Sequence, residues 1–200
     1  MKWIITISAI LLFALAGCGK DKQSTNELIT VDVTKNYPEK ELTLQDFMDV
    51  EYIPLETNDE FVTQGKVMAI GAEVILITNW ANDGNLFVFD RKTGKALKKI
   101  NRKGQGGEEY IGITEIVLDE ANKEIFVIAY TGSKISVYDL DGNFKRSFKA
   151  AGTESHVNTF NYDRENLISY VPDNSLENPS NAIPPYYLIF SKQDGSIIRK

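Results

Sequence analysis

Short apolar runs, rich in β-branched and aromatic residues, follow one another from Leu28 onward, and turns that contain Gly, Asn or Asp separate them. Such runs are typical of β-strands. Apolar residues at helical spacing are scarce, and the one short candidate lies at 43–48, where Thr43 could cap a single turn. The pattern therefore predicts an all-β domain with almost no helix.

Three of these runs repeat one another. They end at Asp90, Asp139 and Ser191, and each leads into a turn that contains glycine, a residue that supplies the positive φ of tight hairpins. Their aromatic residues Phe89, Tyr138 and Phe190 recur about every 50 residues, which is the period of a propeller blade of several strands.

The other runs complete three four-stranded units, so the pattern predicts a β-propeller with about three blades, at 66–101, 114–149 and 157–200. The expected strands are 66–72, 73–79, 85–90 and 96–101; 114–119, 124–130, 134–139 and 144–149; and 157–162, 166–171, 186–191 and 196–200. Nearly continuous apolar second strands suit sheets that are covered on both faces. An antiparallel sandwich is the alternative.

The N-terminus predicts export. Lys2 precedes an apolar run at 3–17 that is shorter than a bilayer span, and the run ends at Cys18, the single cysteine of the chain. Leu15-Ala16-Gly17-Cys18 resembles the bacterial lipobox, which implies removal of residues 1–17 and a lipid such as palmitate on Cys18. The alternative is an ordinary signal peptide with an incidental cysteine.

A polar stretch at 18–27 is expected to be a tether between the lipid and the folded domain at 28–200. The lipid would then be the link to a membrane, either on the periplasmic or on the exposed side of an outer membrane. Lys20-Asp21 loosely resembles a short surface-export signal, although a plain solvated linker is the favoured interpretation.

Charge and composition exclude some partners. The net charge of −6 becomes −7 without residues 1–17, and this balance argues against nucleic acid. Hydrophobic residues make up 42% of the chain, enough for a folded core. Cys18 leaves no second thiol for a disulfide, so the core must supply the stability.

Two motifs carry a family resemblance: DVEYIPLET at 49–57 and RKGQGGEEY at 102–110. Together they resemble the six-bladed β-propeller lipoproteins of Bacteroidetes, relatives of the NHL-repeat propellers. The family usually has Gly-Pro-Gly-Glu-Tyr where this chain has GGEEY at 106–110. The resemblance implies a propeller in the cell envelope and brings no settled activity.

Three blades are half of a six-bladed ring. The early run at 50–56 is expected to be a strand of the closing blade, since closure of the ring protects sheet edges. Either the reading frame is interrupted after Lys200, the favoured interpretation, or the half-ring pairs with another copy.

Catalytic signals are poor, and no catalytic residue, metal site or cofactor is predicted. His156 is the single histidine, so paired-histidine zinc sites are excluded and a Ser-His-Asp triad would need that one residue. Gly104-Gln105-Gly106 lacks the third glycine of a dinucleotide fingerprint, and the run at 139–142 is better explained as a turn than as a calcium loop.

The ligand-binding candidates are Glu108, Glu109 and Tyr110. In a propeller the 102–113 connection lies beside the central channel, where two carboxylates and an aromatic ring would suit a sugar, a peptide, a protein or a cation. The proline-rich 172–185 loop is expected on the same face. The alternative is a glycine-rich crossover that merely turns the chain.

Two functions therefore stay open. The first is a noncatalytic binding or scaffolding lipoprotein. The second is a propeller enzyme of the lyase or lactonase type, whose site would need blades that this chain lacks.

Overall fold

The computed structural model describes residues 31–129, 134–149, 157–172 and 184–200. The expected signal peptide, Cys18, the tether, His156 and most of the 172–185 loop lie outside these residues. The chain divides into two units, 1–49 and 50–200, and each is described by itself.

The described part of the first unit, residues 31–49, contains one short element, the 3₁₀ helix η1 (Leu44–Asp46). The backbone N–H of Thr43 donates to the Asp46 carboxylate at 2.8 Å, and the Thr43 hydroxyl contacts the same carboxylate at 3.2 Å. The single helical turn expected at 43–48 is therefore present.

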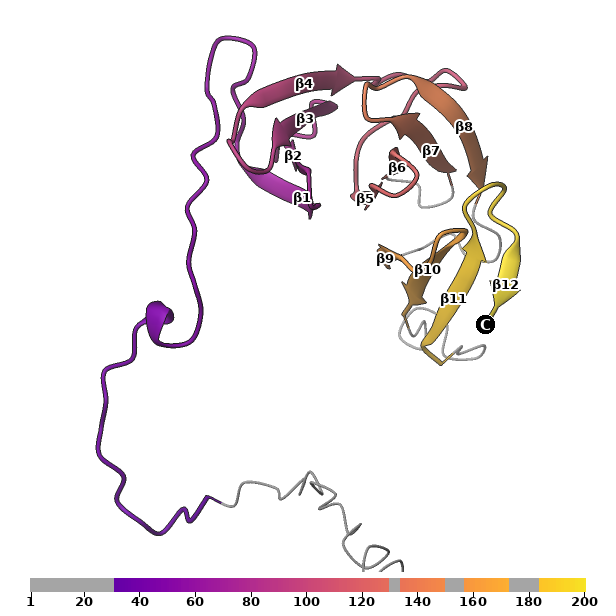
Figure 1. The fold of residues 1–200 in the computed structure, drawn as a ribbon. Helices are drawn as coiled ribbons and strands as arrows, with labels where there is room; N and C mark the ends of the chain where they lie inside the picture. The colour runs from indigo at the N-terminus through magenta and orange to yellow at the C-terminus, as the bar shows by residue number, and fades with distance from the viewer. Residues whose placement is uncertain (1–30, 130–133, 150–156, 173–183) are drawn as a thin grey trace, which may run out of the picture. The chain divides into compact units, whose positions relative to one another are not determined.

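The second unit consists of three four-stranded antiparallel sheets, which we call blades 1, 2 and 3 (Figure 1). Their strands are β1 (Lys66–Ile70), β2 (Val74–Thr78), β3 (Asn85–Asp90) and β4 (Ala96–Asn101); β5 (Glu115–Asp119), β6 (Glu124–Ile128), β7 (Lys134–Asp139) and β8 (Phe144–Lys149); and β9 (Val157–Asn161), β10 (Asn166–Val171), β11 (Tyr186–Ser191) and β12 (Ile197–Arg199). Each blade pairs its strands in chain order. The all-β, four-stranded blade architecture predicted from the sequence is confirmed.

The sequence explains why these strands form. All residues of β2 and of β6 are buried, as expected for apolar runs covered on both faces. Gly94, Gly142 and Gly195 follow the third strands with φ of +69°, +84° and +74°. Such angles favour glycine and produce the tight connection to each fourth strand.

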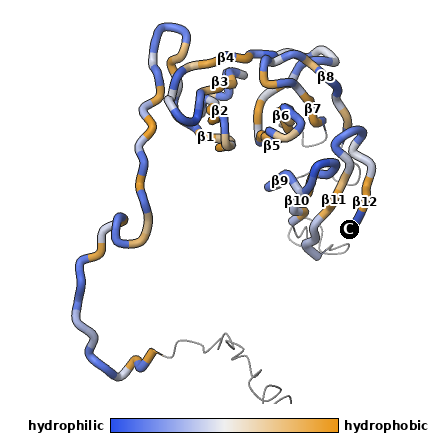
Figure 2. The backbone as a smooth tube through the Cα atoms, viewed as in Figure 1, coloured by the Kyte–Doolittle hydropathy of each residue, from blue (hydrophilic) through white to orange (hydrophobic). Residues whose placement is uncertain are grey.

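Figure 2 shows that the hydrophobic stretches of the second unit coincide with its strands, whereas the turns are hydrophilic. We call the side of a blade that is turned toward the preceding blade its N-face, and the side turned toward the following blade its C-face. One buried cluster joins the C-face of blade 1 to the N-face of blade 2, and includes Leu76, Val88 and Ile125. A second cluster joins the C-face of blade 2 to the N-face of blade 3, and includes Phe126 and Phe190.

A third cluster covers the N-face of blade 1, where no preceding blade is present among the described residues. Ile77, Phe87 and Phe89 are 0–1% exposed there, beneath Phe61 and the partly buried side chains of Ile53 and Leu55. The segment that leads into blade 1 therefore supplies part of the cover that a neighbouring blade supplies elsewhere.

Residues 50–56 form no strand. The prediction of a strand there is not met in the described residues, which include no closing blade as its partner. The Glu56 N–H instead donates to the Gly94 carbonyl at 2.8 Å, and the Glu56 carboxylate accepts the Ala96 N–H at 3.0 Å.

The packing of this segment nevertheless matches that of an outer strand. A Cβ atom at Gly195 would meet the Lys149 carbonyl and the Phe148 ring, both from the end of β8. A Cβ atom at Gly94 would meet the Pro54 carbonyl and the Ile53 side chain in the same way. Ile53 and Pro54 thus lie against blade 1 as the end of β8 lies against blade 3.

Candidate functional site

The connection between blades 1 and 2 closes on itself. The Tyr110 N–H donates to the Arg102 carbonyl, and the Gly104 N–H donates to the Tyr110 carbonyl, both at 3.0 Å. Lys103 and Tyr110 form an isolated bridge. The GQGGEE segment is therefore a compact loop between two residues that are held side by side.

Tyr110 is a core residue. Its side chain is 1% exposed, its hydroxyl donates to the Gly84 carbonyl at 2.7 Å, and the same oxygen accepts the Arg102 N–H at 3.1 Å. Its ring packs edge to face on Tyr138, with centroids 5.9 Å apart. The prediction that Tyr110 contacts a ligand is corrected by this burial: the ring joins two blades.

The same aromatic contact occurs in blade 1. Phe61 precedes β1 by five residues, as Tyr110 precedes β5, and the Phe61 ring packs edge to face on Phe89 at 5.8 Å. Phe89 and Tyr138 occupy equivalent places in their third strands. The contact between a loop aromatic residue and an aromatic residue of the third strand therefore occurs in both blades. The sequence pattern alone did not reveal this repeated contact.

Burial favours the protonated form of Tyr110 and Tyr138, because it disfavours the phenolate. It raises the pKa of Tyr110, and it raises the pKa of Tyr138 to about 12. The Tyr138 hydroxyl donates to the Glu108 carbonyl at 2.7 Å. Both hydroxyls therefore remain hydrogen-bond donors that fix the loop.

The two glutamates of the motif differ. The Glu109 carboxylate accepts the Gly106 N–H at 2.8 Å inside the loop, and Lys134 Nζ donates to the Glu109 and Gly107 carbonyls, each at 2.8 Å. Glu108 is exposed, and its contact with Tyr138 uses the backbone. Of the three predicted residues, Glu108 is the one whose side chain is free to meet a ligand.

The loop shares its face with the turn between the second and third strands of blade 1. Lys103 Nζ donates to the Asn82 carbonyl at 2.8 Å, and Asn82 Oδ1 accepts the Ile113 N–H at 3.0 Å. The corresponding turn of blade 3 is the 172–185 loop, most of which lies outside the described residues.

On the opposite face, a buried ion pair joins blades 2 and 3. Lys192 Nζ lies 2.6 Å from the Asp119 carboxylate, and both side chains are 1% exposed. The ammonium also donates to the Asp163 carbonyl. Seventy-three residues separate the two partners, so neither local pattern nor spacing pointed to this contact.

A second ionic contact adjoins it. Arg146 donates from both terminal nitrogens to the Glu124 carboxylate, at 2.8 and 2.7 Å, and from Nε and Nη2 to the Lys192 carbonyl. Lys145 also pairs with Glu124 at 2.5 Å. Although burial alone would raise the pKa of Glu124, these cations lower it.

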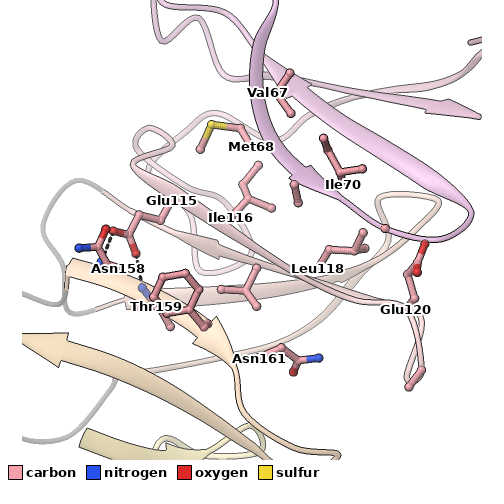
Figure 3. Close-up of a pocket in the computed structure, with 15 residues that line it drawn as sticks. Val67, Met68, Ile70, Glu115, Ile116, Leu118, Glu120, Asn158, Thr159 and Asn161 are labelled. Carbon is pink, nitrogen blue, oxygen red and sulfur yellow. Dashed lines mark hydrogen bonds between the residues drawn. The ribbon is translucent and has the colours of Figure 1, made fainter. Parts of the chain in front are cut away.

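A cavity of about 640 Å³ lies between the innermost strands of the three blades (Figure 3). Its wall includes Val67 and Ile70 of β1, Ile116 of β5, and Phe160 and Asn161 of β9. Val67, Ile70 and Phe160 are 52–61% exposed. This volume lies within the range of small-molecule sites, about 300–1,000 Å³.

Two carboxylates in this cavity bind backbone donors of neighbouring blades. Glu115 accepts the N–H groups of Asn158 and Thr159 at 2.6 and 3.0 Å, as Figure 3 shows. Glu120 accepts those of Ala72 and Glu73 at 2.6 and 2.8 Å. Burial acts to raise the pKa of Glu120, but the N–H donors outweigh it and lower the pKa. Through these hydrogen bonds, Glu115 links blade 2 to blade 3 and Glu120 links blade 2 to blade 1.

Within the described ranges, no group of three or more His, Cys, Asp or Glu side chains is placed to hold a metal ion. No helix in the described part of the chain is long and apolar enough to cross a membrane.

Comparisons with known proteins agree with this architecture. A crystal structure of a protein described as exported, from Bacteroides fragilis NCTC 9343, is similar with a TM-score of 0.57 and 22% identity. The match covers 80% of this chain and 44% of that one, so this chain spans less than half of that protein, and the likeness concerns the fold alone. The computationally designed protein Ika4 gives a TM-score of 0.43 and 16% identity over 76% of this chain and 79% of that one.

No curated protein matches the chain. The model of the DUF5128 family, described as a 6-bladed beta-propeller, matches residues 19–200. The chain therefore belongs to this six-bladed β-propeller family, and its described residues form three of the blades.

Proposed function

We propose that this chain is an exported lipoprotein, anchored to the outer membrane through a lipid on Cys18, whose propeller binds a ligand without catalysing a reaction. The lipobox-like sequence that ends at Cys18 supports the anchor. The similarity to a protein described as exported supports the location in the cell envelope.

The state of the carboxylates in the inner cavity favours binding over catalysis. Glu115 and Glu120 each accept at least two backbone N–H groups, and the pKa of Glu120 is lowered. A general acid or base needs a pKa near the working pH and a free lone pair. Because both carboxylates are engaged by backbone N–H groups, their role is to position the wall of the cavity.

The remaining chemistry of the cavity indicates the kind of ligand. Its exposed side chains are apolar at Val67 and Ile70, aromatic at Phe160 and a neutral amide at Asn161. Such a wall fits a carbohydrate or a peptide through apolar faces and neutral hydrogen bonds. Glu108, on the face of the 102–113 loop, is a second point of contact for a larger ligand such as a protein.

A propeller enzyme of the lyase or lactonase type is the second candidate, because the similar exported protein is more than twice as long as the matched segment. Its site would draw on residues from further blades. Dependence of activity on a divalent metal would favour this candidate over the binding protein.

The anchor is tested by labelling cells with radioactive palmitate. We expect label in the wild-type chain and none in Cys18→Ser. Equal labelling of both proteins would rule out the lipid on Cys18.

The binding site is tested by screening the full chain on glycan and peptide arrays and repeating any hit with variants. Ile70→Asp should weaken binding at least tenfold, because it places a charge on the apolar wall, whereas Trp80→Asp, also at an exposed position, should not. Equal binding by wild type and Ile70→Asp would contradict the proposed site.

A further inference from the structure

A second cavity, of about 490 Å³, lies between blades 2 and 3, beside the buried ion pair of Lys192 with Asp119. Blade 2 contributes the turn before β6 and the start of β8 to its wall, and blade 3 contributes the turn before β10 and the β11–β12 hairpin. The wall therefore comes from two adjacent blades that pack on one another. Its volume lies within the range of small-molecule sites.

The corresponding place between blades 1 and 2 is apolar. The strand registers match Glu124 of blade 2 with Val74 of blade 1. Lys192 directly follows the third strand of blade 3, as Leu140 follows that of blade 2. Val74 and Leu140 both belong to the hydrophobic cluster that joins blades 1 and 2. Two blades of this chain thus pack together without charges at these positions.

Stability alone does not explain the charges between blades 2 and 3. Taking an ion out of water costs several kcal/mol, and apolar residues of similar volume often give a protein equal or greater stability than a buried ion pair. Lys192 and Asp119 are 1% exposed, and the Glu124 side chain is 7% exposed, so this cost applies to each of them. We therefore assign the charged cluster a role in the cavity that it adjoins.

The charges of the cavity are not balanced within it. Its wall carries three cations and two carboxylates, which are Lys145, Arg164 and Lys192, and Glu124 and Glu165. Asp119 pairs with Lys192, and Arg146 binds both oxygens of Glu124. Two cations and one carboxylate remain on the wall, which gives a local surplus of positive charge on a chain whose net charge is −6.

The two remaining cations are available to a ligand. Lys145 Nζ contacts Glu124 at 2.5 Å, but its side chain is 40% exposed and an ammonium has three donors. Arg164 is exposed, and its guanidinium has no ion-pair or hydrogen-bond partner among the described residues. Because a guanidinium binds a carboxylate through two parallel hydrogen bonds, Arg164 suits a ligand that carries a carboxylate.

Neutral polar groups make up most of the remaining wall. They are the amides and hydroxyls of Asn122, Asn166, Ser191, Gln193 and Ser196. The Gln193 side-chain amide has no partner among the described residues, and Ile198 is the one described residue that gives the wall an apolar side chain. Such a wall is complementary to the hydroxyl groups of a sugar, whereas a peptide would need apolar subsites for its side chains.

We propose that the cavity between blades 2 and 3 binds a sugar acid, that is, a saccharide that carries a carboxylate. Lys145 of blade 2 and Arg164 of blade 3 bind the carboxylate, and Gln193 hydrogen-bonds the hydroxyl groups. The buried charges behind the wall hold the two blades together and so keep both cations beside the ligand. This site is separate from the inner cavity, and it does not depend on the function proposed for that cavity.

Calorimetric titration of the full chain tests the site. The probes are disaccharides of galacturonate and of glucuronate, each compared with the neutral disaccharide of the same linkage. We expect a uronate disaccharide to bind, and its neutral counterpart to bind at least tenfold more weakly. The double variant Lys145→Gln with Arg164→Gln should weaken uronate binding at least tenfold. Lys149→Gln, at an exposed lysine of β8 outside the cavity, should bind as the wild type does.

Two further measurements make the result decisive. Both variants should keep the melting temperature of the wild type, because the side chains that they change are exposed. Ile70→Asp, in the inner cavity, should leave uronate binding unchanged, which separates this site from the proposed function. No binding of either uronate at millimolar concentration, equal binding of the neutral sugars, wild-type affinity in the double variant, or loss of binding in Ile70→Asp would each overturn the proposal.

Discussion

The N-face of blade 1 and the C-face of blade 3 are both apolar, but their side chains are buried to different extents. On the N-face of blade 1, Phe87 and Phe89 are at most 1% exposed beneath Phe61, Ile53 and Leu55. On the C-face of blade 3, Tyr187 is 60% exposed, and Ile168, Tyr170 and Ile189 are half-buried. The N-face of blade 1 is therefore buried by the segment that precedes its first strand, whereas no segment among the described residues buries Tyr187 in the same way.

The largest effect should come from opening the covered face. Phe89→Ala should reduce the free energy of unfolding by about 3–5 kcal/mol, because it leaves a cavity in a packed cluster. Tyr187→Ala should cost less than about 0.5 kcal/mol, because the Tyr187 side chain is exposed. Urea unfolding, monitored by fluorescence, measures both losses. Equal losses in the two variants would show that the two faces are equally buried.

Blade 3 depends on blade 2 for its one covered face, and the buried ion pair is part of that contact. Lys192→Met should cost about 3–5 kcal/mol, because it leaves the Asp119 carboxylate buried without its cationic partner. Lys145→Met should cost less than about 1 kcal/mol, since Lys145 is 40% exposed.

The double variant Lys192→Met with Asp119→Leu should recover most of the loss, because no unpaired charge remains. If the double variant is as unstable as Lys192→Met, the loss comes from packing and not from the stranded charge.

The two loop aromatics offer a finer comparison. Tyr110→Phe keeps the ring contact and leaves the Gly84 carbonyl and the Arg102 N–H without their partner, so we expect a loss of about 1–3 kcal/mol. Phe61→Tyr adds a hydroxyl to the corresponding ring in blade 1. It should not stabilise the chain, and a gain there would show that the two loops are less alike than their ring contacts indicate.

The smallest effect concerns pH. The folded-state pKa of Glu120 is lowered, so its contribution is present above the unfolded-state pKa and is lost as the pH falls through the lowered value. Acidification from pH 7 to pH 3 should therefore reduce the urea midpoint more in the wild type than in Glu120→Gln. Equal reductions would mean that Glu120 does not couple blade 1 to blade 2 through its charge.

The sequence predicted the blades well because their signals are local. Alternating apolar runs and the turn glycines Gly94, Gly142 and Gly195 placed all twelve described strands to within two residues at either end. Strand periodicity and turn chemistry act over a few residues, so they can be read from the chain without knowledge of its neighbours.

The site was harder to predict because its contacts are not local. Tyr110 follows two glutamates in a glycine-rich loop and looks exposed in the sequence, but its hydroxyl bonds a carbonyl 26 residues away. In the sequence, Lys192 has the position of an exposed lysine in a turn, but in the fold it forms a buried ion pair with Asp119. Burial of such polar groups depends on the packing of blades, which the pattern of one strand does not contain.

Residues 53–54 cover the N-face of blade 1, as the outer strand of the preceding blade (β4 or β8) covers the N-face of blade 2 or blade 3. The direct test compares the unfolding free energies of Ile53→Ala and Ile100→Ala with that of the wild type. Ile100 is 5% exposed, and Ile100→Ala should cost about 2–5 kcal/mol. Ile53→Ala should cost at least about 1 kcal/mol, since its side chain is partly buried against the same kind of cluster. An Ile53→Ala variant as stable as the wild type, beside a destabilised Ile100→Ala, would contradict the claim.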